Sequence, residues 1–143
     1  MPEQHLGPVG YLILEFPGGQ IGAGGFAALV ERVDRGSLYL IDLEFFRKNA
    51  DGTLSTVVPH DLGSIDGLDL AEFDGAVTGL LDEDDIATVS GAVTSGSLAC
   101  VVIYEELGMR SVLEAFAADG AAVIAEGPVA IDDLEAALDS LDA

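Results

Sequence analysis

Apolar residues occur along this chain of 143 residues in short runs that end at glycine and proline. The first run, residues 9–16, stops at Pro17-Gly18-Gly19 and predicts a strand closed by a turn. The next stretch predicts a helix, because apolar residues recur at helical spacing before a glycine in the usual stop position. These residues are Phe26, Leu29, Val30, Val33 and Gly36.

A second strand is predicted over residues 38–46, where alternate residues fall on opposite faces. One face is apolar and comprises Tyr39, Ile41, Leu43 and Phe45. The other is mixed and comprises Leu38, Leu40, Asp42, Glu44 and Phe46. We expect the apolar face to pack on the helices. Asp51-Gly52 then predicts a turn, and residues 54–58 predict the returning strand of a hairpin.

The order of strand, helix, glycine and strand returns in residues 98–106, 111–119, Gly120 and 121–125. Two such halves predict an α+β fold, a ferredoxin-like sandwich whose antiparallel sheet carries its helices on one face. We expect a single domain over residues 1–143. Its parts are a first half with a hairpin (9–58), a connecting segment with a helix (59–96), a second half (97–127) and a C-terminal helix (128–143).

Two helices in these parts have clear sequence signals. The one in the connecting segment begins at Asp82, since acidic residues in a first turn favour the positive end of the helix dipole. The C-terminal helix has an apolar stripe of Ile131, Leu134, Leu138 and Leu141. This stripe either caps the domain or meets a partner, and capping is the more ordinary outcome for a terminal amphipathic helix.

Charge is strongly unbalanced, with 26 acidic against five basic residues and a formal net charge of −21. Such a field repels phosphate backbones and anionic lipid, so we expect neither nucleic acid nor a membrane as a partner. Three explanations of the acidity remain open. It keeps a chain that is 50% hydrophobic in solution, it reflects a high-salt habitat, or it attracts a cationic partner.

The single cysteine, Cys100, lies in an apolar run and predicts a buried thiol without a disulfide. The N-terminal region carries Glu3 and lacks a basic segment, and no run approaches the roughly 20 apolar residues of a membrane helix. The expectation is a cytoplasmic protein.

Carboxylates stand at or near the ends of the apolar runs in both halves: Glu15, Asp42, Glu44, Glu105 and Glu106. If the halves superpose, several of them converge on one edge of the sheet, as a ligand or hard-cation site requires. No spacing specifies such a site. The alternative is that these acids are solvated or pair with Arg47, Lys48 or Arg110.

Other motifs are weaker. Residues 22–27 fit the glycine pattern of a dinucleotide fingerprint with Asp42 beyond it, but the glycines come late after the strand and the net charge opposes a pyrophosphate. Asn49 and Asp51-Gly52 resemble part of a calcium loop, yet Arg47 stands where the first ligand belongs. His60 beside Asp61 has no assignable nucleophile. We therefore predict no cofactor and no catalytic residues.

Several segments together look like one protein family: residues 7–16, 28–36, 42–52 and 80–85, with the closing helix. The chain resembles a family of small proteins of unknown function from high-GC Gram-positive bacteria. That family is distantly similar to stress-associated proteins, themselves of unknown function. The resemblance implies a stress-related or regulatory role and supplies no catalytic residues.

These observations favour a non-enzymatic module that self-associates, most simply as a homodimer. The residues expected at the interface are Tyr11, Ile13, Leu38, Leu40, Leu134, Leu138 and Leu141. The alternative is a sensor or enzyme for a small ligand or divalent metal, with its site at the sheet edge or between protomers.

Overall fold

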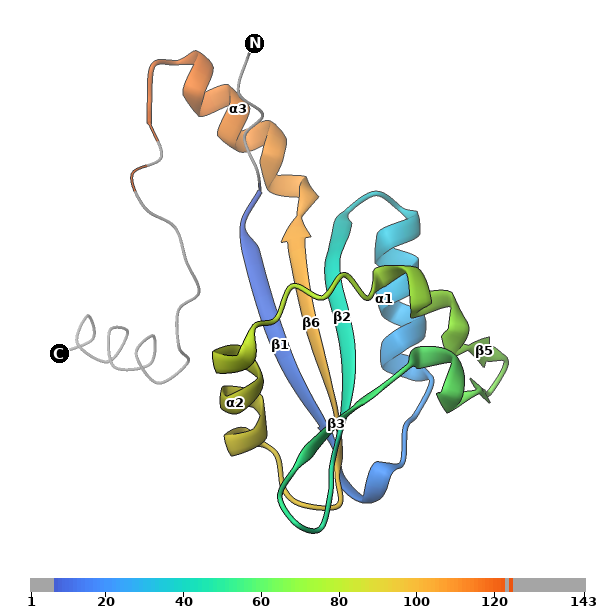
Figure 1. Cartoon of the computed structure of the whole chain (residues 1–143). Helices are drawn as coiled ribbons and strands as arrows, with labels where there is room; N and C mark the ends of the chain where they lie inside the picture. Colours follow the sequence, from blue (N-terminus) through green and yellow to red (C-terminus); the bar gives the residue numbers. More distant parts are fainter. Residues whose placement is uncertain (1–6, 123, 125–143) are drawn as a thin grey trace, which may run out of the picture.

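The computed structural model describes residues 7–122 and residue 124. Its strands are β1 (Val9–Phe16), β2 (Leu38–Lys48), β3 (Leu54–Val57), β4 (Ser64–Ile65), β5 (Leu68–Asp69) and β6 (Leu98–Glu106). Its α-helices are α1 (Gly24–Asp34), α2 (Glu83–Ala92) and α3 (Arg110–Ala118). Short 3-10 helices are η1 (Pro17–Gly19), η2 (Pro59–Leu62), η3 (Leu70–Ala76) and η4 (Leu107–Met109). Figure 1 shows their arrangement.

The main sheet has four strands in the order β1-β6-β2-β3, and every neighbouring pair is antiparallel. β6, the last strand in sequence, therefore lies between β1 and β2. β2 and β3 form the predicted hairpin, and the turn between them contains Asn49, Asp51 and Gly52. β4 and β5 form a separate two-stranded sheet. The fold is thus mixed α+β with an antiparallel sheet.

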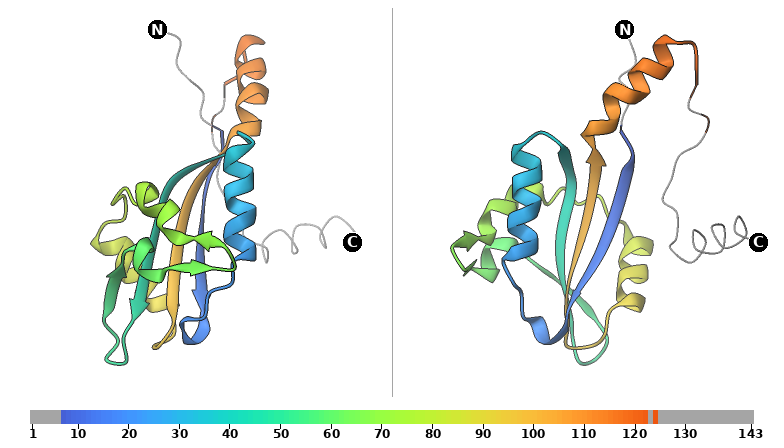
Figure 2. Two further views of the ribbon diagram at one scale, coloured as in Figure 1. Left: turned by 90° about the vertical axis from the view of Figure 1, so that its right-hand side faces the viewer. Right: turned by 180° about the vertical axis from the view of Figure 1, so that it is seen from behind.

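Helices cover both faces of the main sheet, seen edge-on in the left view of Figure 2. Phe26 of α1 packs with Phe45, Cys100 and other residues on one face. Val89 of α2 packs with Phe46 and other residues on the opposite face. The prediction that the helices lie on one face is therefore wrong. Both faces of β2 and β6 carry apolar side chains, so each needs its own cover.

The α1 side holds the larger core. Phe26 stacks on Phe16 with ring centroids 5.8 Å apart. The Phe26 ring centroid also lies 5.7 Å from that of Phe45 and 5.6 Å from that of Phe73. Phe73 and Leu70 come from η3, so the glycine-rich segment after β3 adds apolar residues to this core. Cys100 is buried here as predicted, and burial raises the pKa of its thiol to about 12.

α2 is fixed at both ends. The Asp82 side chain accepts a hydrogen bond from the Asp85 N–H, and the Asp85 side chain accepts one from the Asp82 N–H. This capping box begins the helix as predicted. At the other end Lys48 Nζ donates to the carbonyl oxygens of Ser90 (2.6 Å) and Val93 (2.9 Å). A cation on the last carbonyls stabilises a helix C-terminus and here ties it to β2.

The second predicted half-repeat is only partly present. β6 and α3 occur close to their expected positions, but the described residues at 121, 122 and 124 are not in a strand. No residue of α3 is buried, and the helix extends beyond the end of the sheet (Figure 1). α3 therefore does not return to the sheet as a half-repeat requires. The predicted helix 128–143 lies outside the described residues, and the ferredoxin-like assignment stays a prediction.

A bulge in β2 changes which residues share a face. Leu40 pairs with Tyr104 and Asp42 pairs with the next residue of β6, Ile103, so Ile41 is the extra residue. A bulge of this kind shifts the alternation of side chains. Leu40 consequently packs with Leu43 and Phe45 on the α1 side, whereas the sequence pattern grouped it with Asp42.

Residues 77–81 form a crossover strap, which passes over the α2 side of the sheet from η3 to α2 (Figure 1). Among the described residues, no helix is both long and apolar enough to cross a membrane.

Candidate functional site

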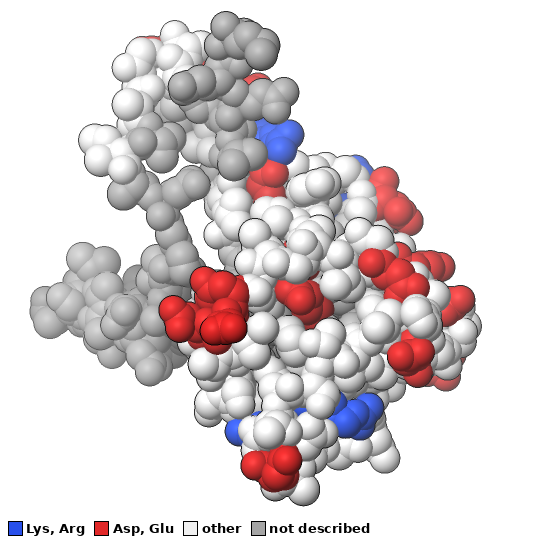
Figure 3. Space-filling model, viewed as in Figure 1, with Lys and Arg blue, Asp and Glu red and all other residues white. Residues whose placement is uncertain are grey.

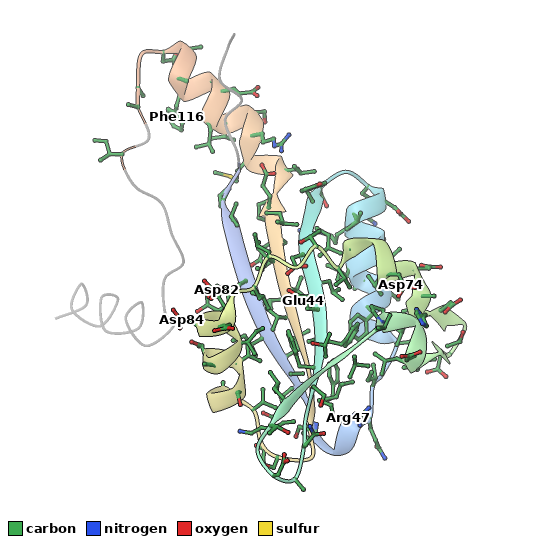
Figure 4. The ribbon with its side chains drawn as sticks, viewed as in Figure 1. Glu44, Arg47, Asp74, Asp82, Asp84 and Phe116 are labelled. Atoms are coloured by element: carbon green, nitrogen blue, oxygen red, sulfur yellow. The ribbon has the colours of Figure 1, made fainter. Side chains whose placement is uncertain are left out.

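Asp42 and Glu44 are two carboxyl residues buried side by side on β2. Their separation of two residues places both side chains on the α2 side of the sheet. Asp42 is 0% exposed and Glu44 is 8% exposed. Figure 4 shows Glu44 near the centre of the sheet, where the strap crosses it. Carboxyl groups are seldom buried this deeply without a cationic partner.

The Glu44 carboxyl holds its proton to an unusually high pH. Burial is the largest cause, followed by a side-chain hydrogen bond with Asp42 and by the negative charge of Asp42, and together they raise its pKa to about 7. The backbone N–H of Leu81 acts in the opposite direction. Two carboxylates at close range cannot both ionise cheaply. Near neutral pH the Glu44 carboxyl group therefore readily gains or loses a proton.

The strap is anchored on this pair. Asp42 Oδ1 accepts a hydrogen bond from the Thr78 backbone N–H at 2.8 Å, and the Thr78 hydroxyl donates to the Ile41 carbonyl at 3.2 Å. The other carboxylate oxygens, Asp42 Oδ2 and Glu44 Oε2, are buried without a donor among the described residues. A proton held between the two side chains, or a bound cation, would satisfy them.

A cavity of about 280 Å³ opens beside Glu44. Its walls come from β2, β3, the turn into η2, and η3 with the start of the strap: Glu44, Phe45, Thr56, Val57, Val58, Pro59, Asp74 and Val77. Most of these side chains are apolar. Glu44 and Asp74 are the acidic members of the wall.

Asp74 is held in place by His60. The backbone N–H of His60 donates to Asp74 Oδ1 at 3.0 Å, and the ring Nδ1 of His60 lies 3.0 Å from Asp74 Oδ2. Asp61, the sequence neighbour that we considered first, lies 3.3 Å from His60 Nε2. The His60 side chain therefore lies between two carboxylates at an exposed position next to the cavity.

Glu105 belongs to a different cluster. Its side chain is 2% exposed and accepts hydrogen bonds from Arg110 Nε and Nη2, both at 2.7 Å, and from the Gly7 N–H at 2.7 Å. Hydrogen bonding to Arg110, opposed by burial, lowers the pKa of Glu105. Gly7 approaches so closely that a Cβ atom there would lie 1.9 Å from the Glu106 carbonyl oxygen. This cluster ties the start of α3 and the chain before β1 to β6.

The five carboxylates of the sequence hypothesis thus lie in separate places. Asp42 and Glu44 form the buried pair, and Glu105 is occupied by Arg110. Glu106 is half-buried beside it. Glu15 is exposed at the opposite end of β1, where Thr94 N–H and Ser97 Oγ lie 3.4 Å from its oxygens. In the described part of the chain, no three His, Cys, Asp or Glu residues are grouped as a metal ion would require.

The apolar residues expected at an interface are also divided. Tyr11 is 62% exposed on β1, and Ile13 packs partly against the α2-side core. Leu38 and Leu40 are half-buried, and Leu40 packs on the α1 side. Leu134, Leu138 and Leu141 lie outside the described residues. A groove of about 440 Å³ runs beside β1, and its walls include Tyr11, Ile13, Leu80, Leu81, Val89 and Ile103.

Comparison with known proteins adds one positive match. Residues 5–143 match the model of a family of unknown function, DUF6325. The chain belongs to the DUF6325 family. No curated protein and no solved structure matches it. Membership of DUF6325 confirms the expectation of a family of unknown function over nearly the whole chain, while the bacterial source and the link to stress-associated proteins stay predictions.

Sequence reasoning named Asp42 and Glu44 but missed the residues that complete their surroundings in this DUF6325 chain. Thr78, Asp74 and Leu81 come from a segment 30 or more positions further along, and no motif marks them. A usable signal was the pair itself, since two acids at alternate positions inside an apolar strand predict a shared face. What they meet there depends on the path of the strap.

Proposed function

We propose that this protein is a non-enzymatic assembly module that forms a homodimer through the outer edge of β1. The observation that carries the proposal is that this strand edge lacks a partner strand among the described residues. β1 is eight residues long, it pairs with β6 on one side, and no described residue pairs with its other side. An unpaired strand edge exposes a row of backbone N–H and C=O groups that readily pair with another strand.

The side chains of β1 also favour such a contact. Val9 (44%), Tyr11 (62%) and Leu12 (46%) are substantially exposed although all three are large and apolar. The strand contains neither proline nor lysine, the residues that commonly protect an exposed edge. The opposite edge strand, β3, has four residues and offers much less backbone for pairing.

The charge distribution makes β1 a suitable surface for self-contact. With a net charge of −21, two copies repel each other unless they meet where acids are few. β1 carries a single charged residue, Glu15, at its end. Figure 3 shows acidic side chains gathered over α2 and over the η2–η3 region on this view of the molecule. An antiparallel pairing centred on Leu12 would set Glu15 opposite Val9 of the second copy.

Two-fold pairing of this kind joins two four-stranded sheets and uses the same residues from both copies. It would also bring the second β1 next to the apolar groove lined by Tyr11 and Ile13. A strand edge with an adjoining apolar groove provides both hydrogen bonds and apolar contact. We further propose that this assembly is cytoplasmic, a location with which the free thiol of Cys100 is compatible.

The test is light scattering on Tyr11→Glu and on a matched control, Tyr39→Glu. Both replace an exposed tyrosine by glutamate and make the net charge equally more negative, but Tyr39 is 56% exposed on β2, away from the β1 edge. We expect the native chain and Tyr39→Glu to have the mass of a dimer at micromolar concentration. Tyr11→Glu should have the mass of a monomer, because in this register the two added carboxylates would be diagonal neighbours on the same face of the joined strands.

A monomeric native chain at high micromolar concentration would overturn the proposal. Equal weakening by both substitutions would assign the association to net charge or to another surface.

A further inference from the structure

The cavity beside Glu44 provides a different kind of contact from the β1 edge. Its volume of about 280 Å³ is close to the lower end of the roughly 300–1,000 Å³ typical of small-molecule sites. Val57, Val58 and Val77 form apolar wall, whereas Glu44 and Asp74 contribute carboxyl groups. Such a lining suits a molecule of few atoms that has an apolar body and a polar or charged end.

The charged end of that molecule should be positive. Glu44 lines the cavity and is only 8% exposed, and its Oε2 is buried without a donor among the described residues. Asp42, which shares a side-chain hydrogen bond with Glu44, also has a buried oxygen, Oδ2, without a donor. In the described part of the chain, no lysine or arginine forms an ion pair with either residue. The pair is therefore a buried acidic group that lacks a cation of its own.

A bare metal ion fits this place poorly. Calcium takes six to eight oxygen ligands and magnesium demands a near-ideal octahedron. The described residues contain no cluster of three or more metal-ligating side chains, and much of the cavity wall is hydrocarbon. An organic ammonium matches both parts of the cavity wall. Its compact charge with hydrogen-bond donors suits the carboxyl groups, and its hydrocarbon stem suits the apolar side chains.

We propose that this cavity binds a small primary amine in its ammonium form, with the ammonium at Glu44 and the hydrocarbon body against Val57, Val58 and Val77. Asp74, held by His60, adds a second carboxylate at the wall. The proposal is independent of the β1 dimer, because none of these residues is on β1.

Because the ammonium would lie at Glu44, its binding should be coupled to loss of the Glu44 proton. The ammonium binds best when Glu44 is ionised, and the pKa of Glu44 in the free protein is about 7. Binding at neutral pH therefore releases a proton from Glu44. The other titratable groups that face it are Asp42 on β2 and Asp74 on η3 with His60. β3 and the strap, residues 77–81, have no titratable side chain, and Glu105 on β6 is paired with Arg110.

The experiment is calorimetric titration of the full chain with n-butylammonium chloride at pH 6 and pH 8, in about 0.15 M salt to screen the general field. n-Butanol is the uncharged control ligand. An alkylammonium stays protonated at both pH values, so the change reports the protein. We expect affinity for n-butylammonium to be about tenfold higher at pH 8, because the ionised fraction of a group with pKa about 7 rises about tenfold.

Glu44→Gln should abolish this binding and its pH dependence while preserving the shape of the side chain. Glu15→Gln is the matched control, since it removes the same charge from an exposed residue near the C-terminal end of β1. Backbone amide shifts of Thr56, Val57 and Val58 in the native chain give a second readout that does not depend on a variant. We expect these three amides to shift on titration with n-butylammonium.

Three results would overturn the proposal: no saturable binding of n-butylammonium at pH 8, equal binding of n-butanol, or equal loss in Glu44→Gln and Glu15→Gln. Amide shifts confined to other parts of the chain would also contradict it.

Discussion

Glu44 is held as a neutral carboxyl by burial and by Asp42, with its pKa at about 7 against an ordinary 4.5. The folded state therefore binds more protons than the unfolded state between these values. Stability falls as pH rises through this window, and the full loss is present above pH 7. At about 1.4 kcal/mol per pH unit, the loss amounts to up to about 3 kcal/mol.

Glu44→Gln keeps the neutral form at every pH and should remove this loss. Urea unfolding should show little difference between Glu44→Gln and the native chain at pH 4, and a more stable variant at pH 8. The control Glu15→Gln should follow the native curve. Parallel pH profiles for the native chain and Glu44→Gln would show that folding does not raise the pKa of Glu44.

Glu105 is a buried carboxylate that, unlike Glu44, has a cationic partner among the described residues, Arg110. The Arg110 guanidinium lowers the pKa of Glu105, so this pair stabilises the fold above the ordinary pKa of a glutamate and the contribution is lost as pH falls. Arg110→Gln should lower the melting temperature by several degrees at pH 7, because Glu105 would be left charged and buried. Thermal unfolding should show the difference shrinking on acidification. A constant difference would mean that Arg110 acts by packing alone.

Single residues also show where sequence analysis succeeds. Cys100 inside an apolar run is buried, as free cysteines usually are. The same reasoning treated Asp42 and Glu44 as solvated strand-end acids or ligands, because burial of a charge is never the default. Only the strap, whose Thr78 binds Asp42, accounts for it.

At the scale of elements, the start of α2 is determined by the residues of its first turn and its N-cap. Asp82→Ala removes the side chain that caps the helix, and the expected cost is about 1 kcal/mol in urea unfolding. Asp84→Ala is the matched control in the same first turn (Figure 4), where no side-chain capping bond is present for Asp84. Its cost should be smaller, since it loses only an interaction with the helix dipole. Equal costs would argue against the capping box.

Local patterns predicted most strands and helices within a few residues, including β1, β2, β3, α2 and β6. They did not predict which face each side chain occupies in β2. The bulge at Ile41 moves Leu40 to the α1 side, and a bulge leaves no mark in the alternation of apolar residues. The elements η2 and η3 were also missed, because their glycines and aspartates indicate a loop while Leu70 and Phe73 are in the core.

At the scale of the whole molecule, the apparent repeat in the sequence did not correspond to two equivalent halves. α3 follows β6 as the repeat predicts, but it extends past the sheet, and α2 covers the second face instead. Topology depends on contacts between distant segments, so similar local patterns can lead to different packing. The consequence for function is that neither sheet face is left free over its centre. Among the described residues, the longest strand edge without a partner strand is that of β1.

The proposed dimer is most directly tested by hydrogen exchange of the native chain at low and high micromolar concentration. We predict that residues 9–16 of β1 exchange more slowly at the higher concentration, because a second copy would pair with their free backbone groups. β3, the opposite edge strand, is the internal control and should not change. Equal exchange of β1 at both concentrations, or slowing confined to other elements, would contradict assembly through the β1 edge.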